Sequence, residues 1–99
     1  MDDSARPAYV VGHITVRDVQ KWAQYRGQVP GTLPEWGGTL VLRGERRAVL
    51  GGEHRHRDVV VLQFPSLESA QGWHDSPAYR ALLPLRHEAA DVDLVLFEG

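Results

Sequence analysis

The sequence contains no cysteine, little net charge and no long apolar run. Without cysteine, disulfides, thiolate metal ligands and a cysteine nucleophile are all excluded. A formal net charge of −2 at pH 7 provides no general attraction for nucleic-acid phosphates or anionic lipids. No apolar stretch approaches the roughly 20 residues that span a bilayer. We therefore expect a cytoplasmic protein with neither a nucleic-acid nor a membrane partner.

The length of 99 residues favours a single domain. The opening stretch, MDDSARP, is acidic and polar and has no apolar signal region. We expect residues 1–7 to be a flexible tail and residues 8–99 to form the domain.

Four segments rich in β-branched and apolar residues predict strands. They are residues 8–16, 39–43, 59–64 and 93–97. After a turn at GERR, the residues AVL at 48–50 are a candidate hairpin partner, and GGEHRHRD is then a polar loop.

Helices are predicted in the two intervals between the outer strands. Asp18 is a suitable N-cap for a helix that runs to about Val29, with a restart at Pro30. Ser66 caps a second helix over 67–75.

Two prolines then divide the segment WHDSPAYRALLPLR, residues 73–86. Proline suits the first turn of a helix and disrupts its interior. We expect short helical pieces over 77–82 and 84–90, with a kink between them.

The order strand, helix, strand, strand, helix, strand predicts an α+β, ferredoxin-like βαββαβ sandwich. In that fold a four-stranded antiparallel sheet carries two helices on one face. Alternation along the strands separates the side chains into two sets. The set expected to face the helices is Val10, Gly12, Ile14, Val16, Leu40, Leu42, Val60, Leu62, Phe64, Leu94 and Leu96. The opposite set is Tyr9, Val11, His13, Thr15, Thr39, Val41, Arg43, Val59, Val61, Gln63, Asp93, Val95 and Phe97.

The second set is too apolar for a face in contact with water, because a sheet that is bare on one side normally alternates apolar and polar residues. A contiguous apolar patch usually marks an interaction site. We expect a second copy of the chain to cover it through a twofold contact. Its polar members, including His13 and Arg43, would then lie inside or at the rim of a homodimer interface.

Three stretches carry a family resemblance: AYVVGHITVRDVQKWAQYRGQVPGTLPEWGG, VVVLQFPSLESAQGWHDSPAYRALLPLR and DLVLFEG. They resemble the domain-of-unknown-function family 1330, from Ala8 to Gly99. That family is similar to the dimeric α+β barrel proteins, in which the sheets of two subunits pair. The wider group includes cofactor-free monooxygenases, haem-degrading enzymes, lactone isomerases and ligand-sensing modules. The resemblance therefore implies a dimer and leaves the function open.

Two positions depart from the family pattern, which has arginine before the third strand and glutamate near its end. Asp58 and Gln63 stand there in this sequence, although Arg57 is adjacent. If the family uses that acid chemically, this chain lacks the step or the loop EHRHR replaces it.

His13 is the candidate catalytic residue, as a general base that Asp93 could orient. The alternative is a structural histidine bonded to a neighbouring strand or to the partner subunit. Tyr25 and Arg26 are candidate substrate-binding residues that form a pocket wall and an anion anchor. The alternative places them beside a core Trp22, with the arginine stem lying along the helix.

Trp73, Tyr79 and Arg86 are further substrate-binding candidates, together with Arg43. An arginine on an apolar stripe needs a partner. That partner is Asp75, Asp91, the other subunit, or a bound carboxylate or enolate that the guanidinium grips with two hydrogen bonds.

Glu53, His54 and His56 suggest metal ligands, because the two histidines project to one side of an extended chain. Spacing alone is weak evidence and does not supply a third ligand, so we interpret them as part of a solvated basic loop. No metal and no cofactor are predicted.

Two hypotheses for function remain. One is a metal-free enzyme, similar to a monooxygenase or an isomerase, that acts on a small apolar carbonyl or enol compound. The other is a non-catalytic binding or sensor module. RNA binding is disfavoured because the third strand offers only Val59, Val61 and Gln63 on the open face and the net charge is negative.

Overall fold

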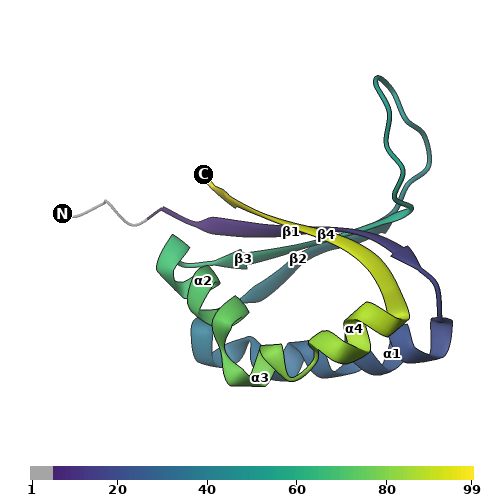
Figure 1. The fold of residues 1–99 in the computed structure, drawn as a ribbon. Coiled ribbons are helices and arrows are strands. Elements are labelled where there is room, and N and C mark those ends of the chain that lie inside the picture. The colour runs from purple at the N-terminus through teal and green to yellow at the C-terminus, as the bar shows by residue number, and fades with distance from the viewer. Residues whose placement is uncertain (1–5) are drawn as a thin grey trace.

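The computed structural model describes residues 6–99 and contains one antiparallel sheet with strand order β2-β3-β1-β4. The strands are β1 (Ala8–Val16), β2 (Thr39–Glu45), β3 (Asp58–Phe64) and β4 (Ala90–Glu98). The helices are α1 (Val19–Gln28), α2 (Leu67–Asp75), α3 (Pro77–Arg80) and α4 (Leu83–Ala89), with short 3-10 turns η1 (Val29–Thr32) and η2 (Pro34–Trp36). All the helices lie on one side of the sheet, and the other side is uncovered (Figure 1). The predicted ferredoxin-like fold is confirmed.

Most of the predicted tail, residues 1–5, lies outside the described residues. Its last residue, Pro7, takes part in the domain, since its carbonyl accepts a hydrogen bond of 3.0 Å from the Gly99 backbone N–H. Within the described part of the chain, no helix combines the length and the apolar character that crossing a membrane requires.

The helices begin where the capping signals predict. The Asp18 side chain accepts a hydrogen bond of 3.0 Å from the Lys21 N–H at the start of α1. The Ser66 hydroxyl accepts one of 3.1 Å from the Ser69 N–H at the start of α2. Each bond satisfies one of the N–H groups that the first turn of a helix leaves free.

The segment after α2 is divided at the positions of its prolines. Ser76 ends α2 and begins α3, because its hydroxyl donates to the Trp73 carbonyl at 2.7 Å and accepts from the Tyr79 N–H at 3.3 Å. Helix α3 ends at Arg80, and α4 starts with Pro84 in its first turn. The predicted pair of short helical pieces is confirmed, and residues 81–82 form a turn between them.

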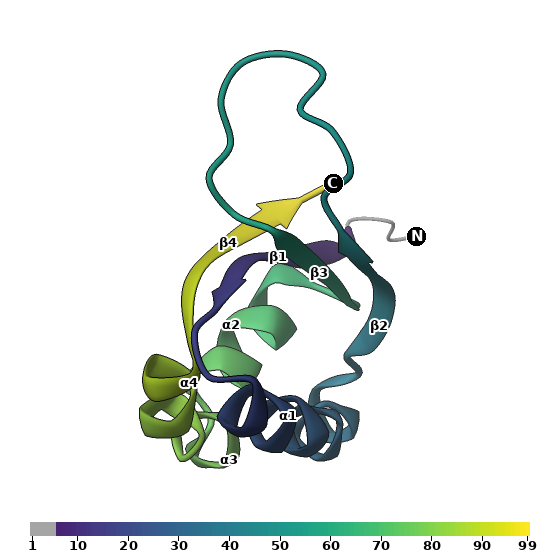
Figure 2. The ribbon, with the colours of Figure 1, turned by 90° about the vertical axis from the view of Figure 1, so that its right-hand side faces the viewer.

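The predicted short strand at 48–50 is wrong. Residues 46–57 form a long loop that projects beyond the sheet between β2 and β3 (Figures 1 and 2). The loop is closed at its base by a hydrogen bond of 2.7 Å from the Arg46 N–H to the Arg57 carbonyl. Leu50, at 97% exposure, packs against nothing that could hold a strand there.

A β-bulge in β2 reverses part of the predicted face assignment. Leu40 lies opposite Leu62, but Leu42 lies opposite Val61, so one residue has no partner at this point. One extra residue turns all later side chains to the other face. Leu42 therefore belongs to the uncovered face and Arg43 to the helix side, contrary to the alternation read from the sequence.

The main core lies between α2, α3 and the middle of the sheet. Its largest fully buried side chains are Trp73, Tyr79 and Phe64. The space between α1 and the β2 side of the sheet is filled less completely. The sheet curves over α1 on this side (Figure 2).

Candidate functional site

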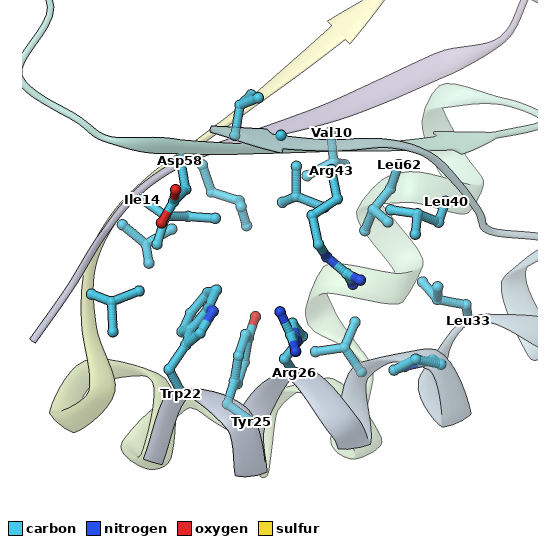
Figure 3. Close-up of a pocket in the computed structure, with 18 of the residues that line it drawn as sticks. Val10, Ile14, Trp22, Tyr25, Arg26, Leu33, Leu40, Arg43, Asp58 and Leu62 are labelled. Atoms are coloured by element: carbon cyan, nitrogen blue, oxygen red, sulfur yellow. The ribbon is translucent and has the colours of Figure 1, made fainter. Parts of the chain in front are cut away.

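A cavity of about 810 Å³ lies between α1 and the helix side of the sheet. Figure 3 shows the sheet above it and α1 below it. Most of its wall is apolar, which suits a ligand with a hydrophobic body. Apolar lining residues include Val10, Ile14, Trp22, Val29, Leu33, Leu40, Val60 and Leu62.

Hydrogen-bonding side chains enter this largely apolar space from both walls. Tyr25 and Arg26 point up from α1, and Arg43 points down from β2 (Figure 3). The bulge in β2 is the reason that Arg43 reaches the cavity. Among residues 6–99, neither guanidinium takes part in an ion pair. Two unpaired cations beside an apolar wall favour an anionic oxygen as a partner.

A carboxylate lies toward one end of the same cavity. Asp58 starts β3 opposite Ile14 and projects into the space near Trp22 (Figure 3). The other departure from the family pattern, Gln63, lies on the uncovered face opposite Tyr9. Of the two, only Asp58 lines the cavity, so only this departure changes its chemistry.

Trp73 lines the cavity and is held by its neighbours in the core. Its ring is 1% exposed, and its centroid lies 4.2 Å from that of Tyr79 and 5.3 Å from that of Phe64. Its indole N–H donates to the Thr32 hydroxyl at 2.9 Å. Trp73 thus lines the cavity as part of the hydrophobic core.

Tyr79 and Arg86 lie behind the cavity wall. The Tyr79 hydroxyl is 2.8 Å from the Tyr25 hydroxyl and accepts a hydrogen bond of 2.9 Å from Arg86 Nη1. The partner of Arg86 is therefore a tyrosine, and neither of the expected aspartates contacts it: Asp75 is paired with His74, and Asp91 with Arg55. The prediction missed this pairing because it depends on contact between α1, α3 and α4.

The pKa of Tyr25 is raised well above its ordinary value. Burial is the main cause, and the neighbouring Tyr79 adds to it, while Arg86 acts in the opposite direction. The Tyr25 hydroxyl consequently keeps its proton throughout the physiological pH range.

His13 lies on the uncovered face, opposite Val59 and Asp93. The structure therefore does not bring it together with Tyr25, Arg26 or Arg43, which are on the helix side. It lies in a cluster with the loop histidines, with ring centroids 5.0 Å from His54 and 6.3 Å from His56. Its Nδ1 is buried without a hydrogen-bond partner among the described residues.

The interpretation of a solvated loop is wrong for His56, which is 3% exposed. One ring nitrogen bonds the Thr15 hydroxyl at 2.9 Å, and the other bonds the Asp93 carboxylate at 2.7 Å. The His56 hydrogen bond, with help from Arg55, holds the pKa of Asp93 below its usual range. Asp93 thus fixes the base of the loop and does not orient His13. Among residues 6–99, no group of three or more acidic or histidine side chains is arranged to hold a metal ion.

The family described as "Domain of unknown function (DUF1330)" matches residues 7–99. The chain belongs to the DUF1330 family. This match confirms the resemblance drawn from three stretches of the chain. Among curated proteins, a sequence search finds no match.

Solved structures share the fold of this DUF1330 protein at low sequence identity. A protein of unknown function from Rhodopseudomonas palustris is 18% identical, with 96% of this chain and 83% of that chain covered and a TM-score of 0.80. A dimeric ferredoxin-like protein of unknown function from Jannaschia sp. is 13% identical, with 94% and 99% covered and a TM-score of 0.76. SnoaB, a cofactor-independent oxygenase from Streptomyces nogalater, is 11% identical, with 96% and 94% covered and a TM-score of 0.70. At these identities the similarity establishes the fold.

Proposed function

We propose that this DUF1330 protein binds a small apolar molecule that carries an anionic or enolic oxygen, in the cavity between α1 and the sheet. One observation carries the proposal: two guanidinium groups that form no ion pair within residues 6–99, together with a tyrosine hydroxyl, enter a cavity whose walls are mostly apolar. The apolar wall would desolvate the ligand body, and Arg26 and Arg43 would hold the oxygen. A location in the cytoplasm is part of the proposal, in keeping with a sequence that has no cysteine.

The probe for this binding is 2-naphthoate, a flat apolar anion, compared with 2-methylnaphthalene, which has the same rings and no charge. We expect the wild-type protein to bind the anion more tightly. Replacing Arg26 or Arg43 with methionine should weaken 2-naphthoate binding by about tenfold or more, because a hydrogen bond to a charged group contributes about 1.5–3 kcal/mol. Quenching of tryptophan fluorescence measures both affinities, since Trp22 and Trp73 line the cavity.

Arg80→Met is the matched control, because Arg80 is exposed on α3 and does not line the cavity. Equal binding of the two probes, or equal affinity in the Arg26, Arg43 and Arg80 variants, would contradict the proposal.

A second candidate is a metal-free enzyme that acts on a carbonyl or enol compound. It is supported by the shared fold of the cofactor-independent oxygenase from Streptomyces and by the carboxylate in the cavity. His13 cannot serve a substrate bound there, because it lies on the opposite face of the sheet. We propose Asp58 as the base instead. It would take a proton from the carbon beside a carbonyl, and the guanidinium groups would stabilise the enolate oxygen.

This reaction can be followed in D₂O by proton NMR with 2-tetralone, an apolar ketone with exchangeable α-protons. Proton removal by Asp58 and return of a deuteron from solvent would replace the α-protons with deuterium faster than in buffer. We expect Asp58→Asn to reduce the protein-dependent rate by about a hundredfold and to retain 2-naphthoate binding. An unchanged rate in Asp58→Asn, or no acceleration by the wild-type protein, would contradict the proposed enzyme. Binding would then be the remaining candidate function.

We also propose that the chain forms a homodimer through the uncovered face of the sheet. This face presents Leu42, Val95 and Phe97 at 50%, 41% and 53% exposure, with Val11 and Val61 between them in register. Proteins with this fold from Jannaschia and Thermobifida fusca are described as dimeric. A twofold contact would bury the apolar centre of the face and leave the cavity, on the other side, accessible.

A further inference from the structure

The Tyr25 hydroxyl in the cavity is the outer end of a hydrogen-bonded chain that runs to Arg86. The two tyrosine oxygens are 2.8 Å apart, and Arg86 Nη1 is 2.9 Å from the Tyr79 oxygen. Tyr79 is 0% exposed and does not line the cavity, whereas Tyr25 does. The chain therefore links a charge behind the wall to a hydroxyl inside the site.

The guanidinium fixes the direction of both hydrogen bonds. Arginine can only donate, so the Tyr79 oxygen is the acceptor in its bond with Arg86. The Tyr79 proton then needs an acceptor of its own, and among the described residues the Tyr25 oxygen is the one within hydrogen-bonding distance. The reverse direction would leave the Tyr79 proton buried and unpaired, at a cost of about 1–3 kcal/mol. Tyr79 therefore donates to Tyr25.

This direction leaves the Tyr25 proton free to be donated elsewhere. The raised pKa of Tyr25 keeps that proton in place, and the side chain points into the cavity (Figure 3). Each bond in the chain polarises the next one, so a cation at one end strengthens the donor at the other. With Arg26 and Arg43, the cavity then offers three donors directed at one region.

We propose that Tyr79 and Arg86 are positioning residues that orient the Tyr25 O–H as a hydrogen-bond donor to a deprotonated oxygen of the bound molecule. The class of ligand that this arrangement selects is a carboxylate, phenolate or enolate on an apolar body. This inference rests on the proposed function, since it requires that the cavity is the binding site.

The decisive variant is Tyr79→Phe, which removes one buried oxygen and leaves the ring that packs on Trp73. We expect its affinity for 2-naphthoate to fall about threefold to tenfold, and Tyr25→Phe to lose about tenfold. Binding of 2-methylnaphthalene should not change in either variant. Arg86→Met should reproduce the selective loss seen in Tyr79→Phe, and Arg80→Met should not.

The double variant separates orientation from a general effect on structure. If Tyr79 acts through Tyr25, Tyr25→Phe/Tyr79→Phe binds 2-naphthoate no more weakly than Tyr25→Phe. Additive losses, or a Tyr79→Phe variant that weakens both probes equally, would overturn the proposal while leaving the cavity as the site. If the wild-type protein binds neither probe, or binds 2-naphthoate without dependence on Arg26 and Arg43, the proposed function fails, and this proposal fails with it.

Discussion

Replacing Trp73 with alanine is expected to lower the free energy of unfolding by about 3–5 kcal/mol. The indole is 1% exposed and lies against both Phe64 and Tyr79. Truncation to alanine removes the apolar contacts of the indole. It also leaves a void that closes only if α2 and α3 move. The change is severe, because folded proteins are stable by only about 5–15 kcal/mol in total.

Urea unfolding, followed by circular dichroism, measures this change, and Trp73→Phe is the matched control. Phenylalanine keeps a ring in the core and loses the hydrogen bond to the Thr32 hydroxyl, which is 2.9 Å in the wild type. We expect the control to lose about 1–2 kcal/mol, for the smaller ring and the missing bond. A loss below about 1 kcal/mol in Trp73→Ala would show that this residue is not part of the core.

Local signals in the sequence explain why the fold could be predicted. Asp18 and Ser66 cap helices by bonds to N–H groups three residues away, so the whole interaction is contained in a short stretch. Pro77 and Pro84 restrict their own backbone and that of their neighbours. These constraints do not depend on the rest of the chain, and the structure keeps each of them.

The incorrect predictions about β2 and His56 have the same physical cause. Contacts between segments far apart in the sequence determine both features. The bulge in β2 depends on how that strand pairs with β3, and the stretch TLVLR contains no glycine to mark it. His56 is buried because Thr15 and Asp93, on two other strands, bond to its ring. A loop that is polar in composition gives no sign of such partners.

Part of the cavity lining could be read from the sequence. Tyr25, Arg26 and Trp73 were candidate substrate-binding residues, and the structure places all three in the cavity wall, whereas Tyr79 and Arg86 do not line it. Arg43 was also a binding candidate, but it was assigned to the uncovered face, and the bulge brings it to the cavity instead. Asp58 was noted only as a departure from the family pattern. The signal that could have identified it was its position at the start of a strand, beside Arg57.

An aspartate at Val61 is expected to convert the proposed homodimer to a monomer. Val61 lies near the centre of the uncovered face, opposite Val11 on β1 and Leu42 on β2. In a monomer the new carboxylate would remain partly hydrated. In a dimer whose sheets pack together it would be buried without a cation, which costs several kcal/mol. We expect the dimer dissociation constant to rise by at least about a hundredfold, which corresponds to about 2.7 kcal/mol.

Size-exclusion chromatography with light scattering at micromolar concentration measures the mass of each species. Gln20→Asp adds the same charge at an exposed position in the first turn of α1, and this control should remain dimeric. Phe97→Lys is a second test, because Phe97 is 53% exposed and its removal costs the monomer little. A monomeric wild-type protein would refute the proposed dimer. Dimeric Val61→Asp and Phe97→Lys variants would show that the chains associate through a different surface, and the apolar face of the sheet would then need another partner.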